Sequence, residues 1–182
     1  MLVVALAVGF GLSYYALTAG QSVGGVRIGP WLAWPDAGKP APNPYSRAYL
    51  TRAGALQLGQ SEGLQFTATT DSNDRPLDRD CRYRIDGTTP VASFWTLAAV
   101  DADWVDIARA PSQPELRSSM LVRADDGAII AYVSKRLSPE NWLEITGTGP
   151  FALVLTLYDT SLLSGFAGGE DLLPSITREG CA

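Results

Sequence analysis

The feature that most constrains the fold is a series of short β-prone segments after Gly63, separated by turn residues and not interrupted by a long helical segment. In residues 64–70 apolar and polar side chains alternate, as in a strand with one buried face. Similar segments cover residues 81–86, 92–100, 120–123, 128–133, 141–146 and 151–158, with a short one near Ile176. Because parallel strands need long, usually helical crossovers, we predict an all-β fold, an antiparallel β-sandwich of the jelly-roll type.

Charge is absent from the N-terminal segment, since no acidic or basic residue occurs between Met1 and Val26. A helix over residues 1–19 would be roughly 28 Å long at 1.5 Å per residue, close to the thickness of the hydrocarbon core of a bilayer. We therefore expect one transmembrane helix over residues 1–19, with the lipid bilayer as its partner. A signal peptide cleaved after Ala19 and a buried helix are the alternatives.

The segment that follows, residues 20–43, is rich in proline and glycine and is expected to be an irregular linker. Its tryptophans are expected to cover one face of the domain core rather than to lie at a membrane surface. Asn43 and Pro44 are residue types that favour the cap and the first position of a helix, so a short amphipathic helix should begin there. Residues 44–182 are then the β-sandwich domain.

Two cysteines, Cys81 and Cys181, lie near the two ends of the predicted strand series. A disulfide between them would stabilise the fold by about 4 to 5 kcal/mol in the chain-entropy model and would require an oxidising compartment. The basic residues after the N-terminal segment favour a cytoplasmic domain by the positive-inside rule, but bulky domains translocate largely regardless of charge. The early start of the apolar segment also suggests a longer, positively charged N-terminus. We expect the disulfide, with two unpaired buried thiols as the alternative.

Composition excludes several classes of activity. The chain contains no histidine, and therefore neither a Ser-His-Asp nor a Cys-His catalytic unit nor a histidine-ligated zinc or haem. Its formal net charge is −5 and its basic residues form no cluster, so we expect no nucleic acid as a partner. It has no glycine motif for phosphates or dinucleotides, and we expect no cofactor.

Carboxylates are the remaining candidates for acid-base or metal chemistry. Glu144 could act as a general acid if it were buried, and Asp101, Asp103 and Asp106 could offer oxygen ligands to calcium. The aspartates lie in a predicted turn, where this residue type is favoured because its side chain bonds to nearby backbone. They also lack the glycine and closing glutamate of an EF-hand loop. We therefore assign neither a catalytic residue nor a metal site.

Aromatic residues are the candidates for ligand binding. Trp95, Trp104 and Trp142 could line a groove for a sugar ring or a lipid tail, whereas burial in the core is the commoner role of such residues. Phe94 precedes Trp95 in a predicted strand, so one of the two must point inward in either register. We expect core packing for most of these rings and keep the groove as a hypothesis.

Several phrases of the sequence also resemble a known family. They are PYSRAYLTRAG, RPLD followed by CRYRIDG, ASFWTLAAVD, NWLEI, GPFALVLTLYD and LPSITR, and together they span residues 44–178. They resemble the family known as domain of unknown function 1214, above all its short, membrane-anchored bacterial members. The resemblance implies a jelly-roll-like β-sandwich and supplies no catalytic residue. The family's usual Asp-Gly turn after the FW strand is replaced here by DADW at residues 101–104.

These observations favour a single-pass protein of the bacterial inner membrane, with its C-terminal domain in the periplasm. The β-sandwich would be a binding or assembly module of an envelope or membrane complex, with other membrane or envelope proteins as partners. Two alternatives belong to other classes: an enzyme that acts on envelope polysaccharide or lipid through carboxylates, and an exported soluble ligand-binding protein. We expect a module rather than an enzyme, because the sequence offers no catalytic set.

Overall fold

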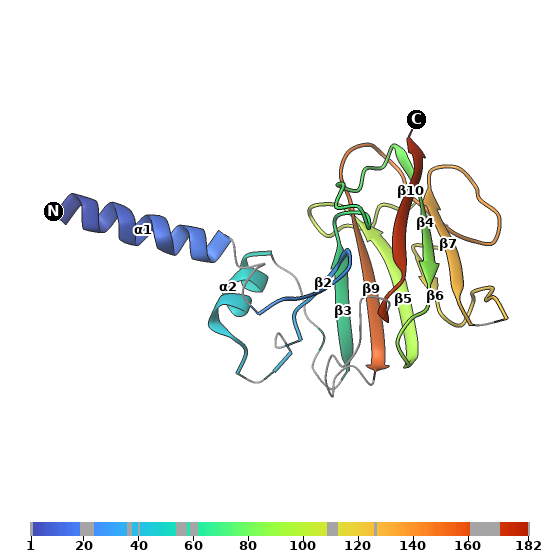
Figure 1. Ribbon diagram of the computed structural model, residues 1–182, viewed down its shortest axis with the longest axis horizontal. Helices are drawn as coiled ribbons and strands as arrows, with labels where there is room; N and C mark the ends of the chain where they lie inside the picture. The colour runs from blue at the N-terminus through green and yellow to red at the C-terminus, as the bar shows by residue number, and fades with distance from the viewer. Residues whose placement is uncertain are drawn as a thin grey trace.

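The computed structural model contains two β-sheets and, in the described part of the chain, two α-helices (Figure 1). It describes residues 2–18, 24–35, 38–39, 41–53, 58, 62–108, 113–125, 127–160 and 172–181. The helices are α1 (Leu2–Thr18) and α2 (Pro44–Ala53). The strands are β1 (Val26–Ile28), β2 (Trp31–Ala33), β3 (Gly63–Ala68), β4 (Cys81–Gly87), β5 (Ala92–Val100), β6 (Glu115–Arg117), β7 (Ile129–Ser134), β8 (Asn141–Glu144), β9 (Ala152–Thr160) and β10 (Ser175–Cys181).

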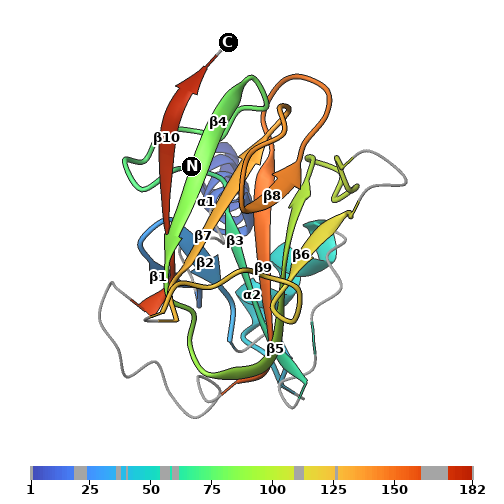
Figure 2. The same ribbon diagram turned by 90° about the vertical axis from the view of Figure 1, so that its right-hand side faces the viewer.

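The strands form two sheets that lie face to face (Figures 1 and 2). The larger sheet has the order β1-β2-β3-β9-β5-β6, and the smaller has the order β10-β4-β7-β8. Between them lies a core built from alternate residues of the long strands, including Phe66, Tyr83, Ile85, Leu97, Leu153 and Leu155. The all-β prediction is therefore confirmed.

One strand pair corrects the expectation of a purely antiparallel sandwich. β8 runs parallel to β7, with Ala131 opposite Asn141. The chain reverses twice within residues 135–140, where Glu140 has a positive φ of 64°. Asn141 holds the returning strand, because its side-chain amide donates to the carbonyl oxygens of Val122 and Ile130, both at 2.8 Å. The connection between these parallel strands is therefore only residues 135–140, far shorter than the crossover that normally joins parallel strands.

The expectation of an irregular linker over residues 20–43 is wrong for residues 26–33, which form the hairpin of β1 and β2. β2 pairs with β3 and so joins the larger sheet. Trp31 is fully buried, and its indole N–H donates to the Pro174 carbonyl oxygen at 2.7 Å. Trp34 is 7% exposed, so the tryptophans of this segment do cover the body of the domain, as expected.

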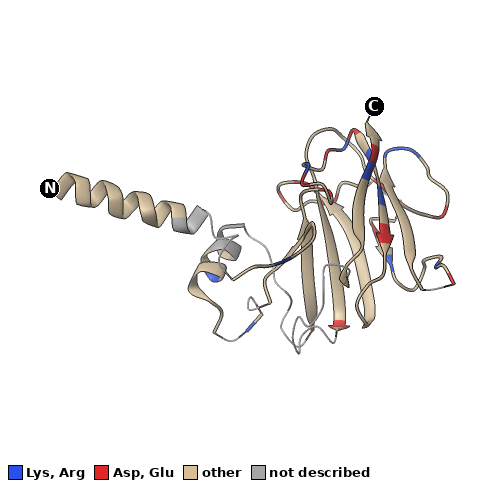
Figure 3. Cartoon of the chain, viewed as in Figure 1, with Lys and Arg blue, Asp and Glu red and all other residues tan. Residues whose placement is uncertain are grey.

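The two helices lie outside the sandwich, on the side of the larger sheet (Figure 1). Asn43 caps α2, since the Tyr45 backbone N–H donates to its side-chain oxygen at 2.9 Å and Pro44 is the first helical residue. α1 has 17 residues and no charge (Figure 3), and its side chains are exposed from Leu2 to Tyr15. In the described ranges no helix is both long and apolar enough to cross a membrane.

Candidate binding groove

A groove of about 550 Å³ opens on the larger sheet, where β2 and β3 approach the loop that follows β5. Leu32, Thr67 and Ala152 line it. Each of them neighbours core residues along its strand, so their side chains point to the face of the sheet opposite to the smaller sheet. The groove is therefore on the outer face of the larger sheet, which is also the side on which the helices lie (Figure 1).

Two loops with the same backbone design border this groove. In the first, the Asp71 side chain accepts hydrogen bonds from the backbone N–H groups of Asn73 and Arg75 at 2.9 and 3.0 Å. The Asp74 backbone N–H donates to the Asp71 carbonyl oxygen at 3.0 Å. Asp74, the fourth residue of the loop, has a φ of 59° and lines the groove. We call residues 71–75 the first Asp loop.

The second Asp loop, residues 101–105, repeats this pattern. The Asp101 side chain accepts from the backbone N–H groups of Asp103 and Val105, both at 3.0 Å. The backbone N–H of Trp104 donates to the Asp101 carbonyl oxygen at 3.1 Å. Trp104 has a φ of 61° and also lines the groove. Both loops thus hold their fourth residue in the left-handed region and present its side chain to the same groove.

The left-handed conformation has different costs at the two positions. Aspartate tolerates it because a short polar side chain bonds locally, whereas a bulky aromatic residue is a rare occupant. Trp104 is nevertheless 37% exposed, so its indole is held open to solvent at a conformational cost that core packing does not explain. Such strained residues occur preferentially at ligand-binding sites.

The walls of the groove combine apolar and polar groups. Trp34, Leu32 and Val100 provide apolar surface, and Thr67, Thr69 and Thr70 add hydroxyl groups from the end of β3. At the rim, the Arg27 guanidinium lies 2.5 Å from the Asp74 carboxylate, with both side chains largely exposed. Arg27 also donates to the Gly29 carbonyl oxygen at 3.0 Å. The rim therefore offers hydrogen-bond donors and acceptors without a net charge.

The first Asp loop is fixed to the smaller sheet by β10. The Asp71 carboxylate is fully buried and lies 2.9 Å from Arg75 Nε and 3.6 Å from Arg178 Nε. Arg178 also donates to the Pro76 carbonyl oxygen. Burial opposes ionisation of Asp71, but the hydrogen bonds from Arg75 and Asn73 together outweigh it, so that the pKa of this carboxyl lies below its ordinary value.

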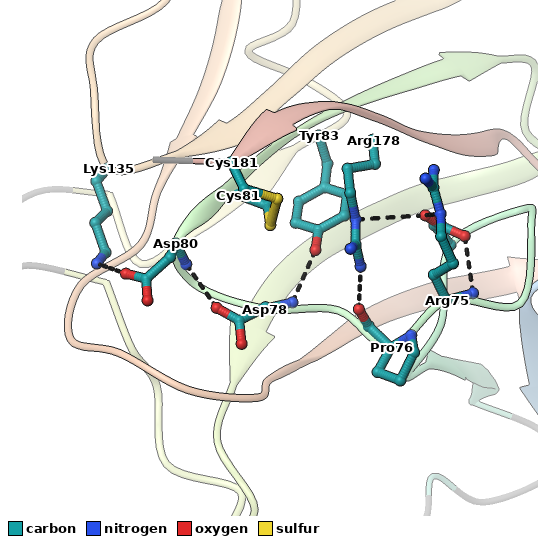
Figure 4. The surroundings of a disulfide bond; sticks show 10 residues. Arg75, Pro76, Asp78, Asp80, Cys81, Tyr83, Lys135, Arg178 and Cys181 are labelled. Atoms are coloured by element: carbon teal, nitrogen blue, oxygen red, sulfur yellow. Dashed lines mark hydrogen bonds and ion pairs between the residues drawn. A yellow bond between two sulfur atoms is a disulfide. The ribbon is translucent and has the colours of Figure 1, made fainter.

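The predicted disulfide is present, and it closes the pairing of β10 with β4. Cys181 lies directly opposite Cys81 in the register, and their sulfur atoms are bonded (Figure 4). Tyr83, two residues along β4, is fully buried, and its hydroxyl oxygen accepts the Asp78 backbone N–H at 2.7 Å. Burial raises the pKa of Tyr83. The disulfide thus lies next to the polar network that supports the first Asp loop.

The candidate metal ligands have other roles or are dispersed. Asp101 is engaged by the backbone of its own loop, and the described residues contain no group of three acidic or cysteine side chains that could hold a metal ion. Asp106 forms an isolated bridge with Val100 rather than joining the loop. Burial raises the pKa of Asp106, and the charge of Glu115 adds to this effect.

The other candidates from the sequence lie apart from the groove. Trp95 is a core residue, 3% exposed, and the Trp142 indole N–H donates to Ser134 on the neighbouring strand at 3.1 Å. Glu144 is half-buried on β8. Because Leu143 and Ile145 on either side are buried in the core, Glu144 points away from the core on the smaller sheet. Trp104 is the one member of the predicted aromatic set that lines the groove.

Sequence reasoning missed Arg27, Trp34, Asp74 and the threonines as groove residues. They come from segments that are distant in the sequence and that the two Asp loops bring together. One sequence pattern could have linked the two Asp loops. DSNDR at residues 71–75 and DADWV at residues 101–105 both begin with an aspartate at the end of a predicted strand. Their equivalence is evident only once the fourth residue is known to have a positive φ.

Comparisons with known proteins give a family and a fold. The model of the family described as "Protein of unknown function (DUF1214)" matches residues 62–162, a range that contains both Asp loops. Among curated proteins, none shows significant similarity to this chain.

Two solved structures are similar to the chain. The VPA0106 protein from Vibrio parahaemolyticus has a TM-score of 0.60 and 20% identity, over 75% of this chain and 36% of that one. A putative uncharacterized protein from Burkholderia cenocepacia has a TM-score of 0.48 and 15% identity, over 98% of this chain and 51% of that one. The chain thus spans about a third to a half of the length of these proteins.

Proposed function

The chain belongs to the DUF1214 family, and we propose that it is a single-pass protein of the bacterial inner membrane whose periplasmic β-sandwich is a binding module of an envelope complex. The observation that carries the proposal is the groove bordered by the two Asp loops. It combines apolar walls, polar groups and a strained, solvent-exposed tryptophan, which is the usual make-up of a ligand site. The jelly-roll type of sandwich is part of the same proposal.

Two features support the location. Residues 1–26 contain no charge. The described helix α1 is shorter than a membrane span, but a helix over residues 1–19 would be roughly 28 Å long, close to the thickness of the hydrocarbon core. The Cys81–Cys181 disulfide is typical of an oxidising compartment such as the periplasm. We therefore propose that residues 1–19 anchor the chain and that the sandwich lies outside the cytoplasm.

A reporter fusion tests the location. Alkaline phosphatase, which is active only outside the cytoplasm, is fused after Ala182 and expressed in a bacterial host. We expect an active fusion that stays in the membrane after an alkaline carbonate wash. An inactive fusion contradicts the periplasmic location, and a released protein whose N-terminus is Gly20 favours the exported ligand-binding protein instead.

Site-specific photo-cross-linking tests the binding module. A photoreactive amino acid at Ala102, which is exposed and lines the groove, should form a discrete adduct in intact cells. The matched control is Leu137, which is 80% exposed and lies in the loop between β7 and β8 on the smaller sheet. Equal labelling at both positions, or none at Ala102, contradicts the role of the groove.

A further inference from the structure

The groove has the chemistry of a carbohydrate site, and we propose that it binds an uncharged saccharide. This inference rests on the proposed function, because it names the ligand class of the same groove. The volume of about 550 Å³ falls within the range of small-molecule sites, about 300 to 1,000 Å³.

The first step of the argument is the exposed indole of Trp104. A large aromatic surface in water is a favourable platform for the flat, apolar face of a sugar ring. The backbone that carries this side chain is held by the second Asp loop, through two backbone N–H bonds to the Asp101 carboxylate and one to its carbonyl oxygen. The position of the Trp104 backbone is therefore fixed before the ligand arrives, which reduces the entropy lost on binding.

The polar groups around the platform suit hydroxyl groups. Arg27 supplies donors and Asp74 supplies acceptors, and they lie 2.5 Å apart at the rim. Adjacent sugar hydroxyls both donate and accept, so one ring can bond to both members of this pair. The hydroxyls of Thr67 and Thr69 are further partners of the same kind.

The same groups disfavour other ligands. An acyl chain would cover the threonine hydroxyls and the ion pair without forming hydrogen bonds to them, which is costly. An anion would meet two carboxylates, Asp74 and Asp101, against one guanidinium, Arg27, among the charged residues that line the groove. A cation would find Asp74 already paired with Arg27 and Asp101 bonded to its own loop.

Calorimetric titration of the full chain tests the proposal. The protein is held in a zwitterionic detergent without a sugar head group, because a maltoside would itself compete for the groove. Maltotriose and N,N′,N″-triacetylchitotriose are the uncharged probes, and decanoate and choline represent an acyl chain and a cation. We expect at least one trisaccharide to bind and Trp104→Ala to weaken it by about tenfold or more.

Two further variants make the result specific. Thr67→Val removes a groove hydroxyl and should weaken the same trisaccharide by about threefold to tenfold, and it keeps the test valid if Trp104→Ala does not fold. Trp142→Phe, on the smaller sheet, is the matched control and should leave the affinity unchanged.

The possible outcomes separate this inference from the proposed function. The saccharide proposal is overturned if neither trisaccharide binds up to about 10 mM, or if binding is the same in the wild type, Trp104→Ala and Thr67→Val. Binding of decanoate or choline that depends on Trp104, without trisaccharide binding, also overturns it but leaves the groove as a binding site. Failure of the proposed function itself would appear in the cross-linking at Ala102.

Discussion

The two Asp loops have the same backbone hydrogen bonds but different surroundings. Asp71 is fully buried and faces Arg75 and Arg178. Asp101 is half-buried, and no basic residue in the described part of the chain forms an ion pair with it. β10 also holds the first loop, since the backbone N–H of Ser72 donates to the Ile176 carbonyl oxygen at 2.9 Å.

The difference shows that loop conformation and loop anchoring have separate sources. An aspartate at the first position, bonded to the backbone two and four residues later, is sufficient for the conformation in both loops. The anchoring comes from contacts with β10, which among the described residues are made by the first loop and not by the second. The first loop is therefore a structural element of the sandwich, and the second presents Trp104 without being tied to the smaller sheet.

The largest expected effect is loss of the disulfide, which removes the covalent support of β10. The double variant Cys81→Ser/Cys181→Ser should lower the free energy of unfolding by about 4 to 5 kcal/mol in the chain-entropy model, because the disulfide closes a loop with a sequence separation of 100. Urea unfolding of the oxidised wild type and the variant measures the loss. The wild type in reducing agent is the control and should match the variant; a loss below about 1 kcal/mol would refute this account of β10.

Asparagine substitution compares the two loops directly. Asn keeps the side-chain oxygen that accepts the backbone hydrogen bonds but removes the charge. Asp71→Asn should therefore cost about 2 kcal/mol, because it leaves the half-buried Arg178 without its anionic partner, whereas Asp101→Asn should cost less than about 0.5 kcal/mol. Equal losses in urea unfolding would show that the ion pairs of Asp71 do not contribute.

The pH dependence of stability tests the contribution of the Asp71 carboxylate charge separately. Because the pKa of Asp71 is lowered in the folded protein, its ionised form stabilises the fold fully above about pH 4, the ordinary pKa of aspartate. This stabilisation is lost as the pH falls through the lower folded value. The difference in stability between the wild type and Asp71→Asn should therefore shrink on acidification below about pH 4. A difference that stays constant down to the acid unfolding of both proteins argues against this ionisation.

Glycine substitution tests whether the fourth positions are equivalent. Comparing Gly with Ala at the same position removes the effect of losing the native side chain. Trp104→Gly should be more stable than Trp104→Ala by about 1 kcal/mol, since only glycine adopts a positive φ without strain. The pair Asp74→Gly and Asp74→Ala should give the same difference, because Asp74 has nearly the same φ. Thermal unfolding that shows no advantage for glycine would contradict the left-handed geometry.

Much of the sandwich could be predicted from the sequence, and the exceptions have physical causes. The segment 92–100 is β5 in full, because nine residues give a clear pattern of apolar residues. β1, β2 and β6 have three residues each, too few for alternation to show, and the prolines and glycines around β2 indicate irregular chain. β8 runs parallel to β7 and is held by the buried amide of Asn141, tertiary contacts that the local pattern does not reveal.

The candidate site was harder to predict than the fold. The disulfide could be expected because the chain has only two cysteines. The groove draws on β1, β2, β3, β5, β9 and two loops, so its composition depends on strand order rather than on any local motif. Trp95, Trp104 and Trp142 look alike in sequence, and only the alternation of the strands and the φ of Trp104 separate the groove residue from the other two.

The position of β10 in the sequence determines when its contacts with the first Asp loop can form. β10 is synthesised after the other described strands, and it brings Arg178 to the first Asp loop. The Cys81–Cys181 disulfide links it covalently to β4, and this bond does not form under reducing conditions. The contacts that β10 makes with the first Asp loop therefore form only after residues 175–181 have been synthesised. The covalent link that holds β10 to β4 requires in addition that the chain has been oxidised.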